Sequence, residues 1–578
     1  MTLSAAQPRT RLTAPRIRPE SRAGLLLLSL VVGVGAGFGA IAFRYMIRGL
    51  TRLFTGFDDY AGLGHVANPN VSGVGRWFVL LTPIVAGLLY GPLVYRFARE
   101  ARGHGVPEVM VAVARNGGRI RPQVAAVKAL ASALCIGGGG SVGREGPIVQ
   151  IGSALGSSLA QLVRLDDRHV KLLVACGAAG GIAATFNAPL AGVFFAMEII
   201  LREWVTQSFG MVVLSSVTAS VIARSILGNN PFLTLPSFQI EHLMQYPLFA
   251  VLGVIAGLTG VVFSRVLYAI EDACDWAWRG PEWLRPAAGG VLLGGLLLVL
   301  PEMYGVGYPV LGKAVAGGYA IGFLCALLVG KLVACSLTIG IGGSGGVFAP
   351  SLFCGAMLGA AFGQVVHSVA PTTGGSAGAY ALVGMGAVFA GAARAPITAI
   401  VILFELTGEY SIILPLMLAV SVAAGVSHLV SHDTVYTRKL LRRGIDIDEP
   451  ADARLRRRPA SAFMAAPPES LRIDDDLRSV AARFATTGDS QLPVIDDTGN
   501  YVGVVAAHQV LDAVAAGESS DVLHLVDKTE PCPADAPMAE ILRRLDRGEG
   551  AVPICDSDGA LSGWVRHRDI LSTLTQSP

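Results

Sequence analysis

Charged residues are scarce in this chain of 578 residues, and neither sign is in strong excess. Only 15% of the residues are Asp, Glu, Lys or Arg, whereas soluble domains carry about 25%. Hydrophobic residues make up 52% of the chain, so most of it is too apolar to lie in water. The net charge of only +3 offers no basic surface for a nucleic acid, and we expect no such partner.

The eight cysteines form no Cys-x-x-Cys pair and do not have the spacing of a metal site. Most of them lie in apolar stretches, where cysteine behaves as a small hydrophobic residue. We therefore expect no metal and no required cofactor.

The N-terminus lacks the cleavage site of a secretory signal peptide, and apolar stretches continue far beyond it. Five arginines precede the first apolar stretch, which begins at Gly24: Arg9, Arg11, Arg16, Arg18 and Arg22. Because basic flanks of membrane spans stay in the cytoplasm, we expect residues 1–22 to form a cytoplasmic tail.

Between residues 23 and 430, apolar stretches alternate with glycine-rich breaks. Several of the stretches are shorter than the ~20 residues that a full membrane span requires. Broken backbone is tolerated at membrane depth only where protein buries it or where it lines a wet cavity. The breaks therefore indicate a site inside a multi-pass membrane protein.

The membrane region is an internal repeat. Residues 139–147 (GGSVGREGP) and residues 342–350 (GGSGGVFAP) share the frame Gly-x-Ser-x-Gly-x-x-x-Pro. Further along, each half has an Ala-Pro dipeptide followed, nine residues after the proline, by an acid, Glu198 or Glu405. Two halves with corresponding broken helices predict a binding site at the midplane between them.

Each glycine-rich turn comes just before an apolar helix that we expect to open with Pro147 or Pro350. Proline suits the start of a helix because its missing N–H would be unpaired there. The other N–H groups of the first turn, together with the helix dipole, favour an anion. Two such helix ends that converge from opposite halves predict an anion site without a full cation, which suits transport because binding stays weak.

Glu145 stands in the first turn of one of these helices. A carboxylate inside a membrane is costly unless it is paired or wet, and it is a functional candidate by default. Because the carboxylate is itself an anion, it can occupy the dipole-lined site and leave when it is protonated. Glu145 is therefore the candidate gate; a plain helix-start acid is the alternative.

The Gly-x-Ser-x-Gly frame also matches the nucleophile elbow of serine hydrolases, which would use Ser141 or Ser344. That interpretation needs a strand before the serine and a histidine partner. Neither copy follows a strand-like segment, and His104 lies in another segment. We expect the protein not to be an enzyme, with a membrane hydrolase as the alternative of another class.

Basic residues gather between residues 438 and 458, which predicts a cytoplasmic position for this part of the chain. We place a basic linker at residues 446–459. The sequence after it has the composition of a soluble α/β region.

This soluble region is itself a repeat. Residues 492–496 (LPVID) recur as residues 552–556 (VPICD), and each copy is followed by a Gly-centred apolar segment. We expect two domains, at residues 460–518 and 519–578.

Three segments resemble the signature loops of the CLC family of chloride channels and chloride–proton antiporters: GHGVP at 103–107, GREGP at 143–147 and GVFAP at 346–350. The segments FELTG at 404–408 and VYTRKLLRRG at 435–444 fit the family as well. The resemblance covers residues 23–445, and residues 460–575 resemble the pair of CBS domains that many members carry.

The resemblance implies an all-α polytopic membrane protein of two inverted halves, at about 23–228 and 244–432, followed by a soluble α/β CBS pair. It further implies a homodimer with one pore per subunit in the lipid bilayer of a bacterial plasma membrane, with both termini in the cytoplasm.

The resemblance also implies roles for individual residues. Glu145 matches the gating glutamate, and Lys128 and Arg144 lie where basic residues shape the field of the pathway. The anion-binding positions are His104, Gly105, Gly146, Val347, Phe348 and Tyr436.

The chain departs from the family pattern at two positions of the pathway. The first loop has His104 where the family usually has a serine; the ring could donate to the anion, become cationic at acid pH, or point elsewhere. Exchangers usually have two acids in series, but here Ile199 follows Glu198. Glu203, expected one helical turn beyond Ile199 on the same face, is the candidate substitute relay, and a solvated helix end is the alternative.

Some CBS pairs bind an adenine nucleotide through an Asp that holds the ribose. Of that motif only Asp569 is present here, and both threonine positions are lost. A nucleotide site and a purely structural role in dimerisation both stay open.

Together these observations predict transmembrane transport of chloride, and of other small anions, gated by protonatable Glu145 in a channel-like or weakly proton-coupled mode. A coupled chloride–proton antiporter that uses Glu203 or another relay is the alternative. A cation-coupled symporter of organic solutes would need sodium sites and a larger pocket than these tight turns provide.

Overall fold

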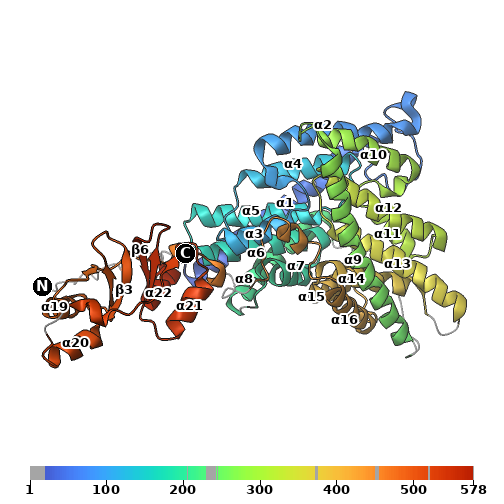
Figure 1. Cartoon of the computed structure of the whole chain (residues 1–578). Helices are drawn as coiled ribbons and strands as arrows, with labels where there is room; N and C mark the ends of the chain where they lie inside the picture. The colour runs from blue at the N-terminus through green and yellow to red at the C-terminus, as the bar shows by residue number, and fades with distance from the viewer. Residues whose placement is uncertain are drawn as a thin grey trace, which may run out of the picture. The chain divides into compact units, whose positions relative to one another are not determined.

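The structure is a computed structural model that describes residues 20–204, 206–228, 243, 245–371, 375–449, 455–518 and 521–576. Most of the predicted N-terminal tail (residues 1–19) and part of the predicted linker (residues 450–454) lie outside the described residues. The chain divides into two compact units, Met1–Ile447 and Asp448–Pro578 (Figure 1).

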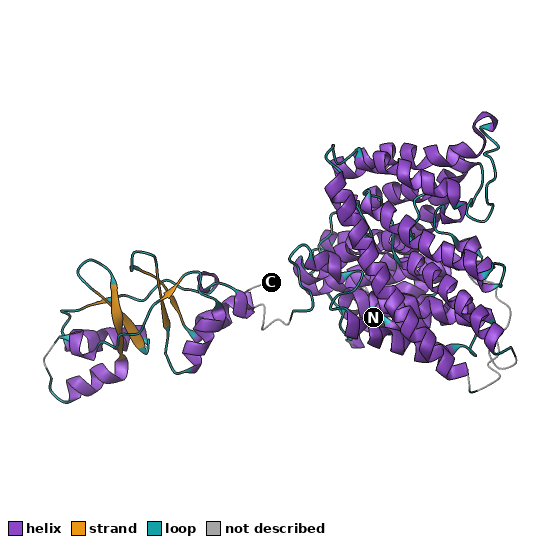
Figure 2. Cartoon of the chain, turned by 45° about the vertical axis from the view of Figure 1, so that its right-hand side comes forward, coloured by secondary structure: helices purple, strands orange, loops and turns teal. Residues whose placement is uncertain are grey.

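The first unit is built from helices (Figure 2). Its first half contains α1 (Arg22–Thr55), α2 (Phe78–Phe97), α3 (Val106–Arg115), α4 (Gln123–Gly137), α5 (Glu145–Leu162), α6 (Asp167–Phe186), α7 (Pro189–Phe195) and α8 (Thr206–Leu227). Its second half contains α9 (Gln245–Ala277), α10 (Arg285–Val299), α11 (Tyr308–Val315), α12 (Ile321–Gly340), α13 (Phe348–Val369), α14 (Ala377–Ala393), α15 (Pro396–Thr407), α16 (Ile413–Val430) and α17 (Thr437–Leu441). Within the described part of the chain, eight helices are long and apolar enough to cross a membrane, as the apolar stretches predicted.

Corresponding helices of the two halves end and begin in the same way. α6 is followed by Asn187 and α14 by Arg394, C-cap residues that both adopt the left-handed conformation, with φ of 60° and 53°. Each is followed by the Ala-Pro dipeptide, whose proline is the first residue of the next helix, α7 or α15. The left-handed residue ends one helix, and the proline starts the next in a new direction.

Glycines let corresponding helix pairs approach closely. A Cβ atom on Gly152 of α5 would lie 2.1 Å from the carbonyl oxygen of Gly177 on α6. In the second half, a Cβ atom on Gly355 of α13 would lie 2.3 Å from the carbonyl oxygen of Gly384 on α14. Backbone contact of this kind is how membrane helices pack without a hydrophobic driving force.

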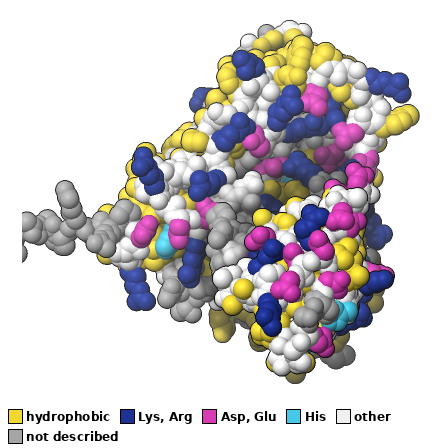
Figure 3. All heavy atoms as spheres, turned by 60° about the vertical axis from the view of Figure 1, so that its left-hand side comes forward, with side chains coloured by type: hydrophobic (Ala, Val, Ile, Leu, Met, Phe, Trp, Pro, Cys, Tyr) yellow, Lys and Arg dark blue, Asp and Glu magenta, His cyan; other side chains and the backbone are white. Residues whose placement is uncertain are grey.

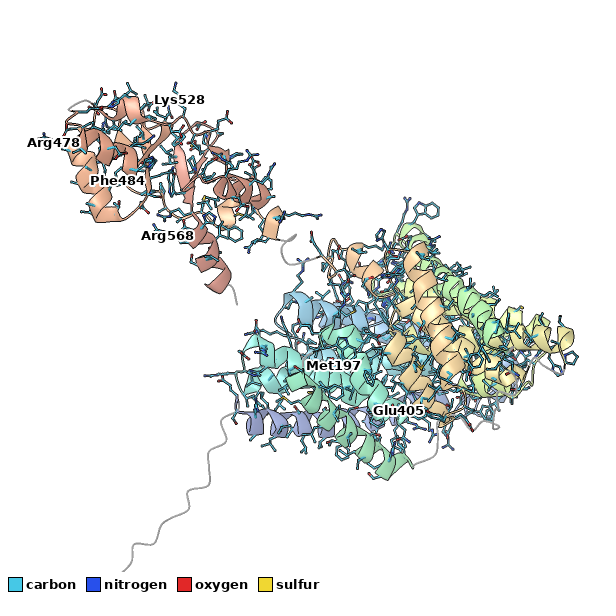
Figure 4. The ribbon with its side chains drawn as sticks, turned by 90° about the horizontal axis from the view of Figure 1, so that it is seen from below. Met197, Glu405, Arg478, Phe484, Lys528 and Arg568 are labelled. Carbon is cyan, nitrogen blue, oxygen red and sulfur yellow. The ribbon has the colours of Figure 1, made fainter. Side chains whose placement is uncertain are left out.

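The two acids of the repeat bind across the boundary between the halves. The Glu198 carboxylate accepts hydrogen bonds from the N–H groups of Ile397 and Thr398, at 3.2 and 2.8 Å, in the first turn of α15. The Glu405 carboxylate, labelled in Figure 4, accepts from Leu190 and Ala191, at 3.0 and 2.7 Å, in the first turn of α7. Each half therefore caps a helix of the other, which satisfies both the carboxylates and the helix starts.

The second unit contains two small sheets of the same topology, in the orders β1-β2-β3 and β4-β5-β6. In each, the first pair is parallel and the second antiparallel. The first copy has β1 (Leu471–Arg472), α19 (Leu477–Thr487), β2 (Gln491–Ile495), β3 (Tyr501–Ala506) and α20 (Ala507–Ala515). The second has β4 (Cys532–Pro533), α21 (Met538–Asp546), β5 (Val552–Cys555), β6 (Leu561–Val565) and α22 (His567–Gln576). The repeat seen at residues 492–496 and 552–556 therefore corresponds to the central strands β2 and β5.

Charged side chains of both signs are interspersed on the face shown in Figure 3, next to broad hydrophobic areas. Among the described residues, no group of three or more His, Cys, Asp and Glu side chains is arranged to hold a metal ion.

Candidate functional site

The three glycine-rich loops of the first unit meet, although they are far apart in sequence. Gly143 and Gly346 exchange two backbone hydrogen bonds, of 2.7 and 2.6 Å, which join the loops before α5 and α13. The loop before α3 joins them, because the Gly103 N–H donates to Gly343 at 3.0 Å and the Gly345 N–H donates to Gly103 at 3.3 Å. Both halves of the repeat thus contribute to one centre.

This centre has no room for side chains where the loops touch. A Cβ atom on Gly146 would lie 2.1 Å from the carbonyl oxygen of His104, and one on Gly105 would lie 2.9 Å from the carbonyl oxygen of Gly146. Gly105 also has a φ of 80°, which favours glycine. Gly105 and Gly146 therefore let the first two loops pack backbone against backbone.

Helices α5 and α13 begin two residues earlier than the sequence predicted. Their first residues are Glu145 and Phe348, and Pro147 and Pro350 occupy the third position. A proline there still removes no helical hydrogen bond, because the first four N–H groups of a helix have no partner within it. Both helix starts lie inside the loop cluster, so their N–H groups and dipoles act at the same centre.

The Glu145 side chain is only 1% exposed. Its Oε1 atom accepts a hydrogen bond of 2.5 Å from the hydroxyl of Tyr308, the first residue of α11. Its Oε2 atom lies over Gly143. Tyr308 has no neighbour in sequence that marks it as functional, so the sequence alone did not single it out.

The other predicted anion-binding residues are buried around the same centre. Val347 is the residue before α13 and Phe348 the first within it, and each is 2% exposed. Phe348 packs against Phe186 and Phe389, with ring centroids 5.5 and 4.4 Å apart. Tyr436 stands just before α17 and is 2% exposed. It is close enough to Glu145 for the two side chains to interact electrostatically.

His104 is fully buried, and its ring faces α9. Its Nε2 atom lies 3.4 Å from the hydroxyl oxygen of Tyr268, which itself donates to the Val435 carbonyl at 2.7 Å. Because Tyr268 has used its hydrogen, the contact is a hydrogen bond only if Nε2 carries the proton. Nδ1 is buried without a hydrogen-bond partner among the described residues. The ring is thus anchored on one side by a residue from the other half of the protein.

Two buried lysines hold the loops. The Lys128 ammonium donates to the carbonyl oxygens of Ala101 and Gly103, at 2.9 and 2.7 Å. The Lys331 ammonium donates to the Ser141 hydroxyl at 2.9 Å and to the carbonyl oxygens of Gly305 and Val306, at 3.0 Å each. The sequence motifs did not include Lys331, yet it stands at the same separation from Lys128 as the second glycine-rich loop from the first. A position-by-position comparison of the two halves of the sequence would therefore have identified Lys331.

Two cavities are lined in part by residues of the loop cluster, the first by Arg144 and the second by Gly103 and Gly342. The Tyr308 vestibule, of about 780 Å³, has Arg144 and Tyr308 in its wall. Its other charged residues are Arg44, Arg48, Asp58, Asp59, Arg224 and Lys313. The Lys439 vestibule, of about 530 Å³, is lined by the charged residues Arg99, Arg102, Glu271, Asp275, Glu282, Arg285, Lys439 and Arg443. Basic residues outnumber acidic ones in both, and such an excess raises the local concentration of anions.

Comparison with known proteins agrees with this geometry. Residues 86–428 match the family described as voltage gated chloride channel. The chain belongs to this family. Residues 460–516 and 525–575 each match the CBS domain.

The H(+)/Cl(−) exchange transporter ClcA of Vibrio parahaemolyticus is 34% identical over 431 residues, which cover 72% of this chain and 89% of that protein. The structure of a slow cyanobacterial Cl−/H+ antiporter matches with a TM-score of 0.64 at 26% identity, over 73% of this chain and 98% of that one. A eukaryotic CLC transporter matches with a TM-score of 0.62 at 21% identity, over 94% of this chain and 97% of that one. These likenesses confirm the predicted fold class, a helical CLC membrane region followed by a CBS pair.

Glu203 does not lie where the relay interpretation requires it, and its position fits the alternative, a solvated helix end. After α7 the chain continues as a π-helix, Ala196–Leu201, and Arg202 then adopts a left-handed φ of 57°. Glu203 lies beyond this end and is exposed, so it does not follow Ile199 by one turn on the same helical face. The prediction rested on a regular helical period, whereas the helix widens and stops here.

The serines of the Gly-x-Ser-x-Gly frames do not have the surroundings of a nucleophile elbow. They follow helices α4 and α12 instead of strands. The Ser141 hydroxyl accepts from Lys331, and the Ser344 hydroxyl donates to the Ala101 carbonyl at 2.7 Å. These contacts serve the loop cluster, and the hydrolase alternative finds no support.

In the CBS pair, the Asp569 carboxylate is engaged by its own chain. It accepts from the backbone N–H and the guanidinium of Arg566, at 3.0 and 2.8 Å. Arg566 also donates to Asp489 of the first CBS domain at 2.9 Å. The residue that would hold the ribose of a nucleotide thus belongs to an ionic link between the two domains.

Proposed function

We propose that the protein transports chloride, and with it other small anions, across a lipid membrane. The observation that carries this proposal is the buried centre where two helix starts from opposite halves meet, next to loop residues that line two basic vestibules. Backbone N–H groups and helix dipoles supply positive potential there without a mobile cation, so an anion can bind and still leave.

Glu145 acts as the gate of this pathway. Its ionised carboxylate lies at the start of α5, where the helix dipole favours negative charge, and it competes with the transported anion for that place. Protonation removes the charge and with it the competition. Transport is therefore expected to rise as the pH falls.

We propose further that transport is coupled to protons, in preference to the channel-like mode that the sequence favoured. The exchange activity named for the ClcA relatives and for the cyanobacterial antiporter supports this choice. Proton coupling needs a second proton-carrying group besides Glu145. Ile199 cannot carry a proton, and Glu203 is not placed beside it. Water or another group therefore serves as this second relay.

The protein is proposed to work as a homodimer with one pathway per subunit, in a bacterial plasma membrane with both termini in the cytoplasm. Exposed apolar side chains on α16, including Leu414 and Met417, are suited to lipid or to a second apolar surface. For the CBS pair we favour a structural role over an adenine nucleotide site, because Asp569 is already paired with Arg566. Calorimetric titration of the full chain with ATP and AMP tests this, and saturable binding would contradict it.

The main test uses the purified chain in lipid vesicles loaded with chloride. The membrane potential is clamped with potassium and valinomycin, and chloride efflux and internal pH are recorded together. Chloride efflux above that of empty vesicles supports the function, and uphill proton movement driven by a chloride gradient supports coupling. Chloride efflux without proton movement would support the channel-like mode of transport instead of coupling. The absence of chloride efflux would refute the proposed function.

A further inference from the structure

Tyr308 connects the gate to the wall of a vestibule. Its ring lines the Tyr308 vestibule, and its hydroxyl reaches the Glu145 carboxylate at 2.5 Å. A hydrogen bond from a hydroxyl to an ionised carboxylate is about twice as strong as one between neutral groups. The bond therefore favours the charged form of Glu145 over the neutral one.

The segment before Tyr308 is held so that the hydroxyl points at the gate. Lys331 binds the carbonyl oxygens of Gly305 and Val306, and the same ammonium binds Ser141 of the loop that precedes Glu145. Gly307 adopts a φ of 89°, and a Cβ atom there would lie 3.1 Å from the ring of Phe353. One buried lysine thus sets the position of Tyr308 relative to the gate loop.

The charged and titratable groups around Glu145 come from four elements. Arg144, just before α5, lies with its guanidinium carbon 5.1 Å from the centre of the Tyr308 ring. Lys331 on α12 and Tyr436 beside α17 lie within electrostatic range of the carboxylate. Tyr308 on α11 donates its hydroxyl directly to the carboxylate, and the same hydroxyl is a hydrogen-bond partner of Arg144. Removal of that hydroxyl therefore changes these two contacts and leaves Lys331 and Tyr436 as they are.

We infer that Tyr308 is a latch, a positioning residue that holds ionised Glu145 in the pathway and sets the pH at which the gate opens. This inference rests on the proposed transport function and adds a residue to its gate. When Glu145 is protonated, the hydroxyl faces a neutral carboxyl group, the bond weakens, and the side chain can leave.

The test is Tyr308→Phe, which removes the hydroxyl and keeps the ring that packs against Arg144. Without the hydrogen bond the ionised gate is less stable, so protonation opens the pathway at higher pH. We expect the pH of half-maximal chloride efflux to rise by about one to two units, the size expected for a charge-assisted hydrogen bond to a carboxylate. Efflux at neutral pH should increase accordingly.

Tyr304→Phe is the matched control. Tyr304 lines the same vestibule, but its hydroxyl donates to the carbonyl oxygen of Gly137 at 2.7 Å. The control should keep the pH profile of the unchanged protein. An equal shift in both variants would mean that the vestibule as a whole sets the pH response, and would overturn the latch.

A second comparison uses the neutral gate. In the Glu145→Gln background, Tyr308→Phe should not move the pH profile, because no carboxylate remains for the hydroxyl to stabilise. A further shift in the double variant, or an unshifted profile in Tyr308→Phe alone, overturns the inference. In either case chloride efflux by the unchanged protein still supports the proposed function, whereas its absence refutes that function independently.

Discussion

Gly143→Ala should displace the gate by steric contact alone. The added Cβ atom would lie 2.0 Å from Oε2 of Glu145, whereas its next neighbour, the Cβ atom of Ala349, is 3.2 Å away. Gly143 does not have a positive φ, and its two hydrogen bonds with Gly346 use only backbone atoms. The loop can therefore keep its conformation, and the carboxylate end of the Glu145 side chain moves away from the new methyl group.

The magnitude follows from the contacts of the carboxylate. To reach ordinary van der Waals distance from the new methyl group, Oε2 must withdraw by more than about 1 Å. A movement of that size breaks the 2.5 Å hydrogen bond between Oε1 and Tyr308. A hydrogen bond to a charged group contributes about 1.5–3 kcal/mol, so the closed gate should lose about ten- to a hundredfold in population.

The assay is chloride efflux from vesicles at neutral and acidic pH, with thermal unfolding recorded to verify the fold. Gly143→Ala should approach at neutral pH the rate that the unchanged protein reaches only in acid. Gly312→Ala, on α11 in the wall of the same vestibule, is the control, because its new Cβ atom would meet no heavy atom within 4 Å. A folded Gly143→Ala protein with the rate and pH profile of the unchanged protein would refute the placement of the gate.

Three other variants probe the same pathway. Glu145→Gln, which mimics the protonated gate, should transport at all pH values and lose most of its pH dependence; an unchanged profile would remove Glu145 from the gate. His104→Ser, which removes the ring held by Tyr268 and restores the usual residue of the family, should shift the relative permeability of chloride, nitrate and bromide. Identical selectivity in acid and in alkali would place the ring outside the pathway. Glu203→Gln should leave chloride efflux and proton movement nearly unchanged, because Glu203 is exposed beyond the end of the π-helix; loss of proton movement alone would instead make it the relay.

The sequence by itself determined the parts of the protein that depend on composition and local pattern. Apolar stretches predicted the membrane helices, because an uncharged run of that length cannot lie in water. The paired frames at 139–147 and 342–350 predicted two related halves, and the positions of Pro147 and Pro350 marked helix starts to within two residues. Glu145 could be singled out because a carboxylate inside an apolar membrane segment is costly and is rarely found there without a functional role.

Only the tertiary structure decided which groups meet. Tyr308 and Glu145 are 163 residues apart, and neither segment contains a pattern that refers to the other. The same holds for the caps that Glu198 and Glu405 supply to helices of the opposite half: the sequence showed the acids but not their partners. For Glu203, the local pattern was itself insufficient. A place on the same helical face as Ile199 required a regular helical period, whereas a π-helix and a left-handed residue end the helix before Glu203. Local patterns fix the type of an element, whereas contacts between distant elements follow from how the halves pack.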